Sequence, residues 1–195
     1  MRKESEGVTE NLLASARKEF LEYGFHDASL RRISADSGVS TNSIYTRFGD
    51  KDGLFTAIVK EAADELMAIY SDSIKKAGDA TDISRAEDAG DEGTDLVLEY
   101  IYRHPEEFKL IFCCSAGTEY ETYFDRLAAK EEYYYKQFAK AVFGWRTSVD
   151  DFLSMYIAGT DGSMCMNSSH MIRAMKRQKN LWQMSEHLTM RAGRR

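Results

Sequence analysis

Apolar residues recur three or four residues apart along most of the chain, which is the spacing of one face of an α-helix. From Val8 to Phe20 this pattern predicts a first helix that ends near Tyr23, before Gly24. A second stripe, from Leu54 to Tyr70, predicts a long helix of about five turns. The same spacing predicts helices over roughly 96–104, 105–116, 118–143, 148–176 and 178–190. We therefore expect an all-α protein.

Between the first helix and the long one, two short helices are predicted around a tight turn. Ser29 is expected to cap the first of them through its side-chain oxygen. Leu30 and Ile33 then lie on one face, three residues apart. Gly38 ends this helix, because glycine adopts the left-handed conformation of a helix C-terminus at little cost.

Ser40 is expected to cap the next helix, which runs from Thr41 to Arg47. Ile44 and Phe48 lie four residues apart and face the core, so the remaining residues face outward. A short helix with hydroxyls, an amide and a guanidinium on its outer face suits the major groove of DNA. The outward set is Thr41, Asn42, Ser43, Thr46 and Arg47. Together the two helices predict a helix-turn-helix.

Over about residues 8–60 the chain resembles the TetR family of transcriptional regulators. The resemblance implies a three-helix DNA-binding head, residues 1–50, and a helical effector-binding and dimerisation body, residues 51–195. Asn42 and Arg47 depart from the residues usual in the family, and both lie on the outer face of the second helix. The matching positions are Phe20, Gly24, Phe25, Ser29, Ile33, Gly38, Val39, Ser40, Ile44, Tyr45, Phe48, Lys51, Leu54 and Phe55, and Arg47 lies within this matched stretch as one of the two departures.

The resemblance implies that Ser29, Tyr45 and Lys51 contact DNA phosphates. Lys51 also lies in the first turn of the long helix, where backbone N–H groups already favour an anion. The side chains expected to face bases are Arg31, Thr41, Asn42, Ser43, Thr46 and Arg47. Arginine can pair with guanine and asparagine with adenine through two hydrogen bonds, so these residue types would contribute most of the specificity.

We expect a homodimeric repressor that binds a pseudo-palindromic operator and responds to a small-molecule effector, as in TetR-like proteins. The alternative is a helix-turn-helix adaptor that binds protein partners without specific DNA binding. The effector pocket is expected among residues 96–172, with Phe112, Tyr123 and Met155 as candidates for its wall. Methionine and aromatic side chains suit such a pocket, although most of them fill the core.

Charge by itself gives no sign of a DNA-binding protein, because the net charge is −6. Residues 1–60 hold nine basic and nine acidic residues, so the whole excess of acid lies in residues 61–195. Four cations, Arg31, Arg32, Arg47 and Lys51, cluster within the motif and could face phosphates together. The polar stretch 77–94, with its glycines and acidic residues, is expected to be a loop.

Cys113, Cys114 and Cys165 are odd in number and two are adjacent, which argues against a disulfide framework. Reduced core thiols are the expected reading, with a cysteine-dependent enzyme and a thiol-reactive or metalloid sensor as alternatives. No catalytic motif is present, so we expect no enzyme, cofactor or metal site. No apolar run approaches the roughly 18 residues of a membrane helix, and we expect a cytoplasmic protein.

Overall fold

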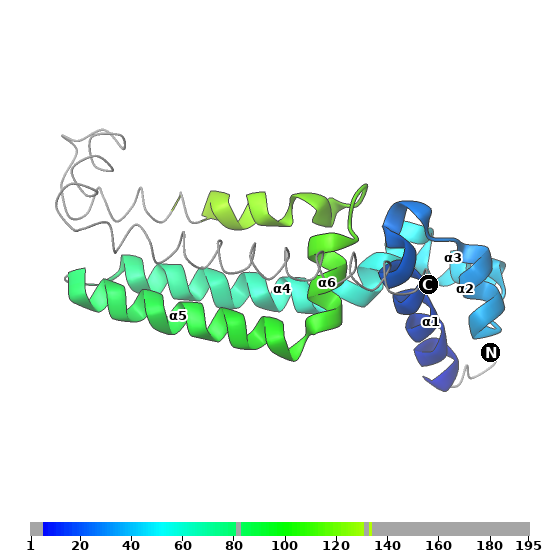
Figure 1. The fold of residues 1–195 in the computed structure, drawn as a ribbon, viewed down its shortest axis with the longest axis horizontal. Helices are drawn as coiled ribbons and strands as arrows, with labels where there is room; N and C mark the ends of the chain where they lie inside the picture. Colours follow the sequence, from blue (N-terminus) through cyan, green and yellow to red (C-terminus); the bar gives the residue numbers. More distant parts are fainter. Residues whose placement is uncertain (1–5, 81–82, 131–132, 134–195) are drawn as a thin grey trace, which may run out of the picture. The chain divides into compact units, whose positions relative to one another are not determined.

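The computed structural model describes residues 6–80, 83–130 and 133, and all regular secondary structure there is helical (Figure 1). This confirms the prediction of an all-α fold. Residues 123–130 form a further helical segment. The elements are α1 (Glu6–Asp27), α2 (Leu30–Ser37), α3 (Thr41–Phe48), α4 (Lys51–Gly78), α5 (Ile83–Arg103), α6 (Pro105–Cys113) and the 3₁₀ helix η1 (Glu119–Thr122).

The chain divides into two compact units. The first consists of the residues up to Asp64 together with His104–Tyr123, and it contains α1, α2, α3, the start of α4, α6 and η1. The second consists of Glu65–Arg103 and the residues from Phe124 onward. Helix α4 contributes residues to both units. The expected domain limits, 1–50 and 51–195, stay a prediction.

The two glycines that were expected to end helices both adopt positive φ angles. Gly24 has φ 71° and ψ 169°, which breaks the helical path of α1 near its predicted end. The helical assignment nevertheless resumes after this kink and runs to Asp27. Gly38 has φ 70° and ψ 8° and forms the left-handed C-cap of α2.

An aromatic cluster forms the core of the first unit where α1, α4 and η1 meet. The Phe20 ring lies 5.1 Å from the Phe55 ring, and the Phe25 ring lies 5.5 Å from it, both edge to face. Tyr120 of η1 completes the cluster at 6.0 Å from Phe55. Such edge-to-face pairs add specific geometry to the hydrophobic burial of the rings. The end of α1 is thereby fixed against the start of α4.

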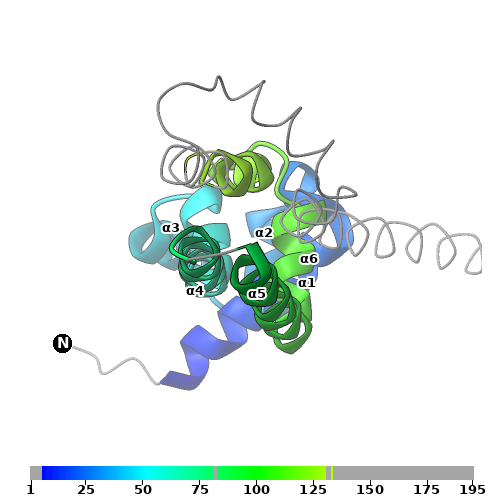
Figure 2. The ribbon, with the colours of Figure 1, turned by 90° about the vertical axis from the view of Figure 1, so that its left-hand side faces the viewer.

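In the second unit, the later part of α4 and α5 run side by side (Figures 1 and 2). The expectation of a loop over 77–94 is wrong, because α4 reaches Gly78 and α5 already begins at Ile83. Gly93 shows why: a Cβ there would lie 2.5 Å from the Ser73 Cβ. Gly93 lowers the helix propensity of this stretch, but it also permits the close packing of α5 on α4. The tertiary contact therefore overrides the propensity.

Two further boundaries differ from the prediction. Helix α6 begins at Pro105 as expected but ends at Cys113, where the Cys114 N–H donates to the Leu110 carbonyl. The next segment opens as a 3₁₀ turn, because the Thr118 side chain accepts the Tyr120 N–H. The helices predicted over 148–176 and 178–190, together with Met155 and Cys165, lie outside the described residues.

None of the helices in the described ranges has both the length and the apolar character needed to cross a membrane.

Candidate nucleic-acid interface

Helix α3 is built as the sequence predicts. Ser40 is its N-cap and accepts the Ser43 N–H at 3.2 Å, while the two serine hydroxyls lie 3.0 Å apart. Ile44 is fully buried and anchors the helix in the core. The Gly49 N–H donates to the Tyr45 carbonyl and closes the C-terminus. The helix is therefore fixed at both ends and along its inner face.

The outer face of α3 presents polar side chains to solvent. Asn42 and Thr46 are exposed, and Tyr45 is 54 % exposed. The Thr46 hydroxyl donates to the Asn42 carbonyl at 2.8 Å, one turn back along the helix. Thr41 and Ser43 are half-buried at its start. This face offers an amide, a phenol and hydroxyls to a partner.

Arg47 and Arg31, the two arginines expected to read bases, differ in their surroundings. The Arg47 guanidinium donates from Nη1 to the Thr9 hydroxyl of α1 at 3.0 Å, in a half-buried position. Arg31 of α2 is exposed and has no hydrogen-bond or ion-pair partner in the part of the chain that the structure describes. Arg31 is thus accessible to DNA as it stands, whereas Arg47 first has to leave Thr9.

The predicted capping role of Ser29 is wrong, because its side chain makes no cap hydrogen bond. Its backbone N–H donates instead to the Glu19 carboxylate of α1, at 2.8 Å. A buried carboxylate beside the first turn of α2 satisfies one backbone donor and complements the helix dipole. The Ser29 hydroxyl is therefore not engaged in capping α2 and can contact a phosphate.

Glu19 also binds Arg32, through Nε at 2.8 Å and Nη2 at 2.5 Å. The hydrogen bond to Glu19 raises the pKa of the Arg32 guanidinium, which stays charged. That guanidinium lies 4.3 Å from the centre of the Tyr23 ring and also donates to the Asp27 carbonyl at 2.8 Å. These contacts fix the connection between α1 and α2, the helix that carries Arg31.

Lys51, expected to contact a phosphate, is partly engaged within the protein. Its ammonium donates to the His26 and Ala28 carbonyls at 3.0 and 3.2 Å, and it lies 4.7 Å from the centre of the Phe25 ring. An ammonium has three N–H donors. Two are used here, which leaves one for a phosphate oxygen.

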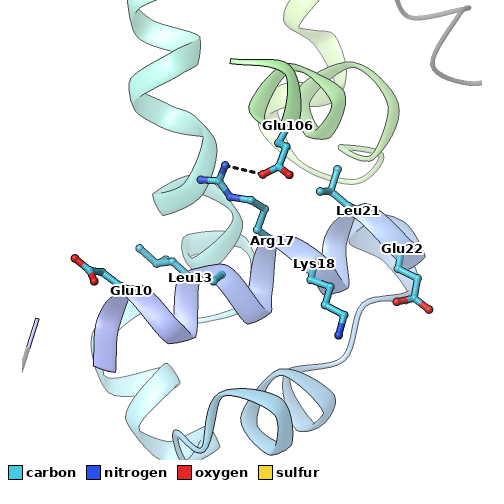
Figure 3. A pocket seen from close by; sticks show the side chains of 8 residues that line it. Glu10, Leu13, Arg17, Lys18, Leu21, Glu22 and Glu106 are labelled. Carbon is cyan, nitrogen blue, oxygen red and sulfur yellow. Dashed lines mark hydrogen bonds and ion pairs between the residues drawn. The ribbon is translucent and has the colours of Figure 1, made fainter. Parts of the chain in front are cut away.

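A groove of about 780 Å³ follows the outer side of α1 beside the start of α6 (Figure 3). Arg17 reaches across it to Glu106 at 3.2 Å and also binds Glu107 at 2.5 Å. Its other lining is mixed, with charges of both signs around apolar side chains: Glu10, Leu13, Ala14, Lys18, Leu21 and Glu22. This composition selects no particular cofactor. Among the described residues, no group of three or more His, Cys, Asp or Glu is placed to hold a metal.

Phe112 and Tyr123, two of the residues expected at an effector pocket, are brought together in the first unit. Their ring centres are 6.3 Å apart and both side chains are buried. The Tyr123 hydroxyl donates to the Ala63 carbonyl of α4 at 2.6 Å. In this arrangement they pack as core residues, and their role in an effector site stays a prediction.

Sequence reasoning missed Glu19, the residue that organises the start of α2. A signal was present, because Leu12, Ala16 and Glu19 follow the spacing of the buried face of α1. A carboxylate on such a face needs partners, since an unpaired buried charge is costly. The partners themselves, Ser29 and Arg32, are ten and thirteen residues away and depend on the turn between the helices.

Comparisons with known proteins agree with this geometry over the helix-turn-helix. Residues 12–58 match the family model of bacterial regulatory proteins, tetR family. The HTH-type transcriptional repressor AcnR of Corynebacterium glutamicum is 34 % identical over 64 residues, which are 33 % of this chain and 34 % of that protein. An HTH-type transcriptional repressor of Mycobacterium tuberculosis is 38 % identical over 60 residues, 31 % of this chain and 32 % of that protein. The chain therefore spans about a third of the length of the curated relatives it matches.

A solved TetR family regulator, PfmR of Thermus thermophilus, aligns with 88 % of this chain and 94 % of its own, with a TM-score of 0.48 and 14 % identity. The similarity to the family does not depend on that structural likeness and is confined to the first 60 residues or so. There, the capped helix α3, the glycine turn before it and the matched family model coincide. Over residues 12–58 the chain is therefore similar to the TetR family of bacterial regulatory proteins.

Proposed function

We propose that this protein is a transcriptional regulator, most simply a repressor, that binds operator DNA through α3. The observation on which the proposal depends is the outer face of α3, where Asn42, Tyr45 and Thr46 are exposed on a helix fixed by its cap and by buried Ile44. A helix of this size with such side chains fits the major groove. The matched relatives from Corynebacterium glutamicum and Mycobacterium tuberculosis are named as repressors, which supports the direction of regulation.

The proposed DNA-contacting residues divide into those that would contact bases and those that would contact the phosphate backbone of the DNA. We assign base contacts to exposed Arg31 and to the outer face of α3: Thr41, Asn42, Ser43, Thr46 and Arg47. We assign phosphate contacts to Tyr45 of the same helix and to Ser29 and Lys51, which lie outside α3. The available Ser29 hydroxyl, the exposed Tyr45 phenol and the third donor of Lys51 support this division.

We further propose that the protein acts as a homodimer in the cytoplasm, with a head of residues 1–50 and a body of residues 51–195. One recognition helix reads few base pairs, and two related by a two-fold axis read a pseudo-palindrome with half-sites about one turn of DNA apart. A small molecule bound in the body would release the operator by favouring the DNA-free arrangement.

The test is fluorescence anisotropy with DNA selected by the purified full chain, comparing wild type with Asn42→Ala and Thr46→Ala. We expect each substitution to weaken binding to the selected site while binding to unrelated DNA changes little. A control variant, Asp64→Ala, changes an exposed residue of α4 away from α3 and should bind as wild type does. No selection of any sequence, together with capture of a protein partner, would favour the adaptor alternative instead.

A further inference from the structure

Two adjacent thiols mark the C-terminal end of α6, and the proposed function makes no use of them. Cys113 is the last residue of the helix and is half-buried, while Cys114 is its C-cap and is 7 % exposed. Both side chains are reduced thiols. Neighbouring Cα atoms are about 3.8 Å apart, less than the roughly 4.4–6.8 Å that a disulfide usually spans. A direct bond between the two sulfurs is therefore disfavoured. An atom that bridges them, with a bond of about 2.3 Å to each, allows a larger distance between the sulfurs.

Cys114 is also a direct contact of the DNA-binding head. Its carbonyl accepts the Phe25 N–H at 2.8 Å, and Gly117 of the same turn lies against the Phe25 ring. That ring packs on Phe55, and the Lys51 ammonium lies over its face. The turn that contains the thiols thus supports the end of α1 and a proposed phosphate contact at once.

We propose that Cys113 and Cys114 form a two-thiol binding site for a trivalent thiophilic ligand with two exchangeable positions, the class represented by monosubstituted arsenicals. Soft thiol ligands select soft centres of this kind. The described residues offer no set of three or more ligands, which disfavours a tetrahedral metal and suits a centre whose third position is already occupied. The consequence for DNA described below rests on the proposed function; the site itself does not.

With phenylarsine oxide as the probe, the chemistry requires no oxidant or reductant. Each thiol replaces one bond of arsenic to oxygen, two arsenic–sulfur bonds form, and the two thiol protons leave with the oxygen as one water molecule. The arsenic keeps its phenyl group and its oxidation state. One reagent therefore consumes two thiols, which distinguishes this site from a single reactive cysteine.

Binding at Cys114 has to open the end of α6, because that side chain is buried. Cys113 is the accessible entry, and capture of the second thiol then disturbs the bond from the Cys114 N–H to Leu110 and the bond from Phe25 to Cys114. A ligand that prefers the opened turn shifts the protein toward it. By linkage, operator DNA that prefers the closed turn must weaken ligand binding by the same factor.

The site is tested with full-length Cys165→Ser protein, which leaves the adjacent pair as the remaining thiols. Native mass spectrometry should show one phenylarsine adduct, and thiol titration should show that both thiols are lost. A dithiol such as 2,3-dimercaptopropanol should reverse the adduct, whereas the same thiol concentration of 2-mercaptoethanol should not. Cys113→Ala and Cys114→Ala in this background should each lose the dithiol-specific adduct. An adduct that consumes one thiol, or that persists in both variants, overturns the proposal.

The effect on the head is measured separately, by anisotropy on the selected operator with the same protein. One equivalent of phenylarsine oxide should weaken operator binding at least tenfold, and saturating operator should weaken arsenical binding to the same degree. Operator binding by Cys113→Ala should be the same with and without the reagent. Unchanged operator affinity with a full adduct would overturn the coupling. If the unreacted protein binds no DNA, the proposed function fails, while the adduct experiment still decides the thiol site.

Discussion

Glu19 fixes the start of α2, because its carboxylate lies where a backbone N–H of that helix needs an acceptor. It accepts the Ser29 N–H and pairs with Arg32, from a position on the buried face of α1. A serine side chain that capped α2 would have accepted a backbone N–H of the same helix, whereas Glu19 also links α2 to α1. The position of α2, which carries the proposed DNA contact Arg31, therefore depends on a residue that has no proposed contact with DNA.

Glu19→Ala should lower the free energy of unfolding by about 1.5–3 kcal/mol, since it removes hydrogen bonds to a charged group and leaves Ser29 N–H without its acceptor. Urea unfolding followed by circular dichroism measures the change. Asp64→Ala, which removes the partner of Lys60 in an exposed pair four residues apart on α4, is the control and should leave the unfolding midpoint where it is. Equal losses in both variants would contradict the stabilising role assigned to Glu19.

Lys51 and Arg47 carry similar charge but are expected to act differently on DNA. Lys51→Ala should weaken binding to all sequences alike and lower the salt slope by about one, as expected for a phosphate contact. Arg47→Ala should cost about 1–3 kcal/mol on the selected site and relax the preference at one position. Binding to a panel of single-base operator variants at several salt concentrations separates the two effects.

Both side chains also have partners within the protein, so stability has to be measured alongside binding. Lys51 donates to two carbonyls at the end of α1 and Arg47 to the Thr9 hydroxyl. Binding data are compared at temperatures where each variant is fully folded. The assignment is contradicted if both variants lose discrimination between sequences equally.

At the scale of elements, local sequence signals predicted the helix-turn-helix. The features that they did not predict depend on contacts between residues distant in sequence. Gly38, the Ser40 cap and buried Ile44 belong to a stretch of seven residues, and the structure has each in its predicted role. Helix α5, by contrast, packs closely at Gly93 against Ser73, which lies twenty residues earlier in the sequence. Composition alone predicts a polar loop over this stretch. The hydrogen bonds from Arg47 to Thr9 and from Lys51 to the His26 carbonyl were missed for the same reason, because the partners are distant in sequence.

The contact between α4 and α5 can be tested at its closest point. Gly93→Ala adds a Cβ that would lie 2.5 Å from Ser73 Cβ, so the helices must separate, at a cost of about 1–3 kcal/mol. Gly78→Ala is the matched control, because no atom lies within 4 Å of the added Cβ and alanine favours the helix. Thermal unfolding should show a lower midpoint for the first variant alone. A midpoint for Gly93→Ala at or above that of wild type would contradict the packing described for this unit.

At the scale of the whole molecule, the proposed regulator needs two heads held at a fixed spacing. Residues 1–60 are neutral and residues 61–195 carry the whole net charge of −6, so attraction to phosphates comes from a few placed cations rather than from net charge. The affinity for DNA should accordingly fall with rising salt concentration, with a slope that corresponds to only a few phosphate contacts. The spacing of the two half-sites should equal the distance between the two heads of the dimer. Sedimentation of the purified chain at micromolar concentration should give a dimer, and a stable monomer would contradict this part of the proposal.

The central claim is that the outer face of α3 reads a specific DNA sequence. The most direct measurement is selection of bound DNA from a random pool by the purified full chain, sequenced after several rounds and repeated with Asn42→Ala. We predict enrichment of a two-fold symmetric sequence with half-sites about one turn of DNA apart, and a changed preference at one position in each half-site for the variant. A pool that shows no enriched sequence, or the same sequence for wild type and Asn42→Ala together with equal affinity, would contradict the account.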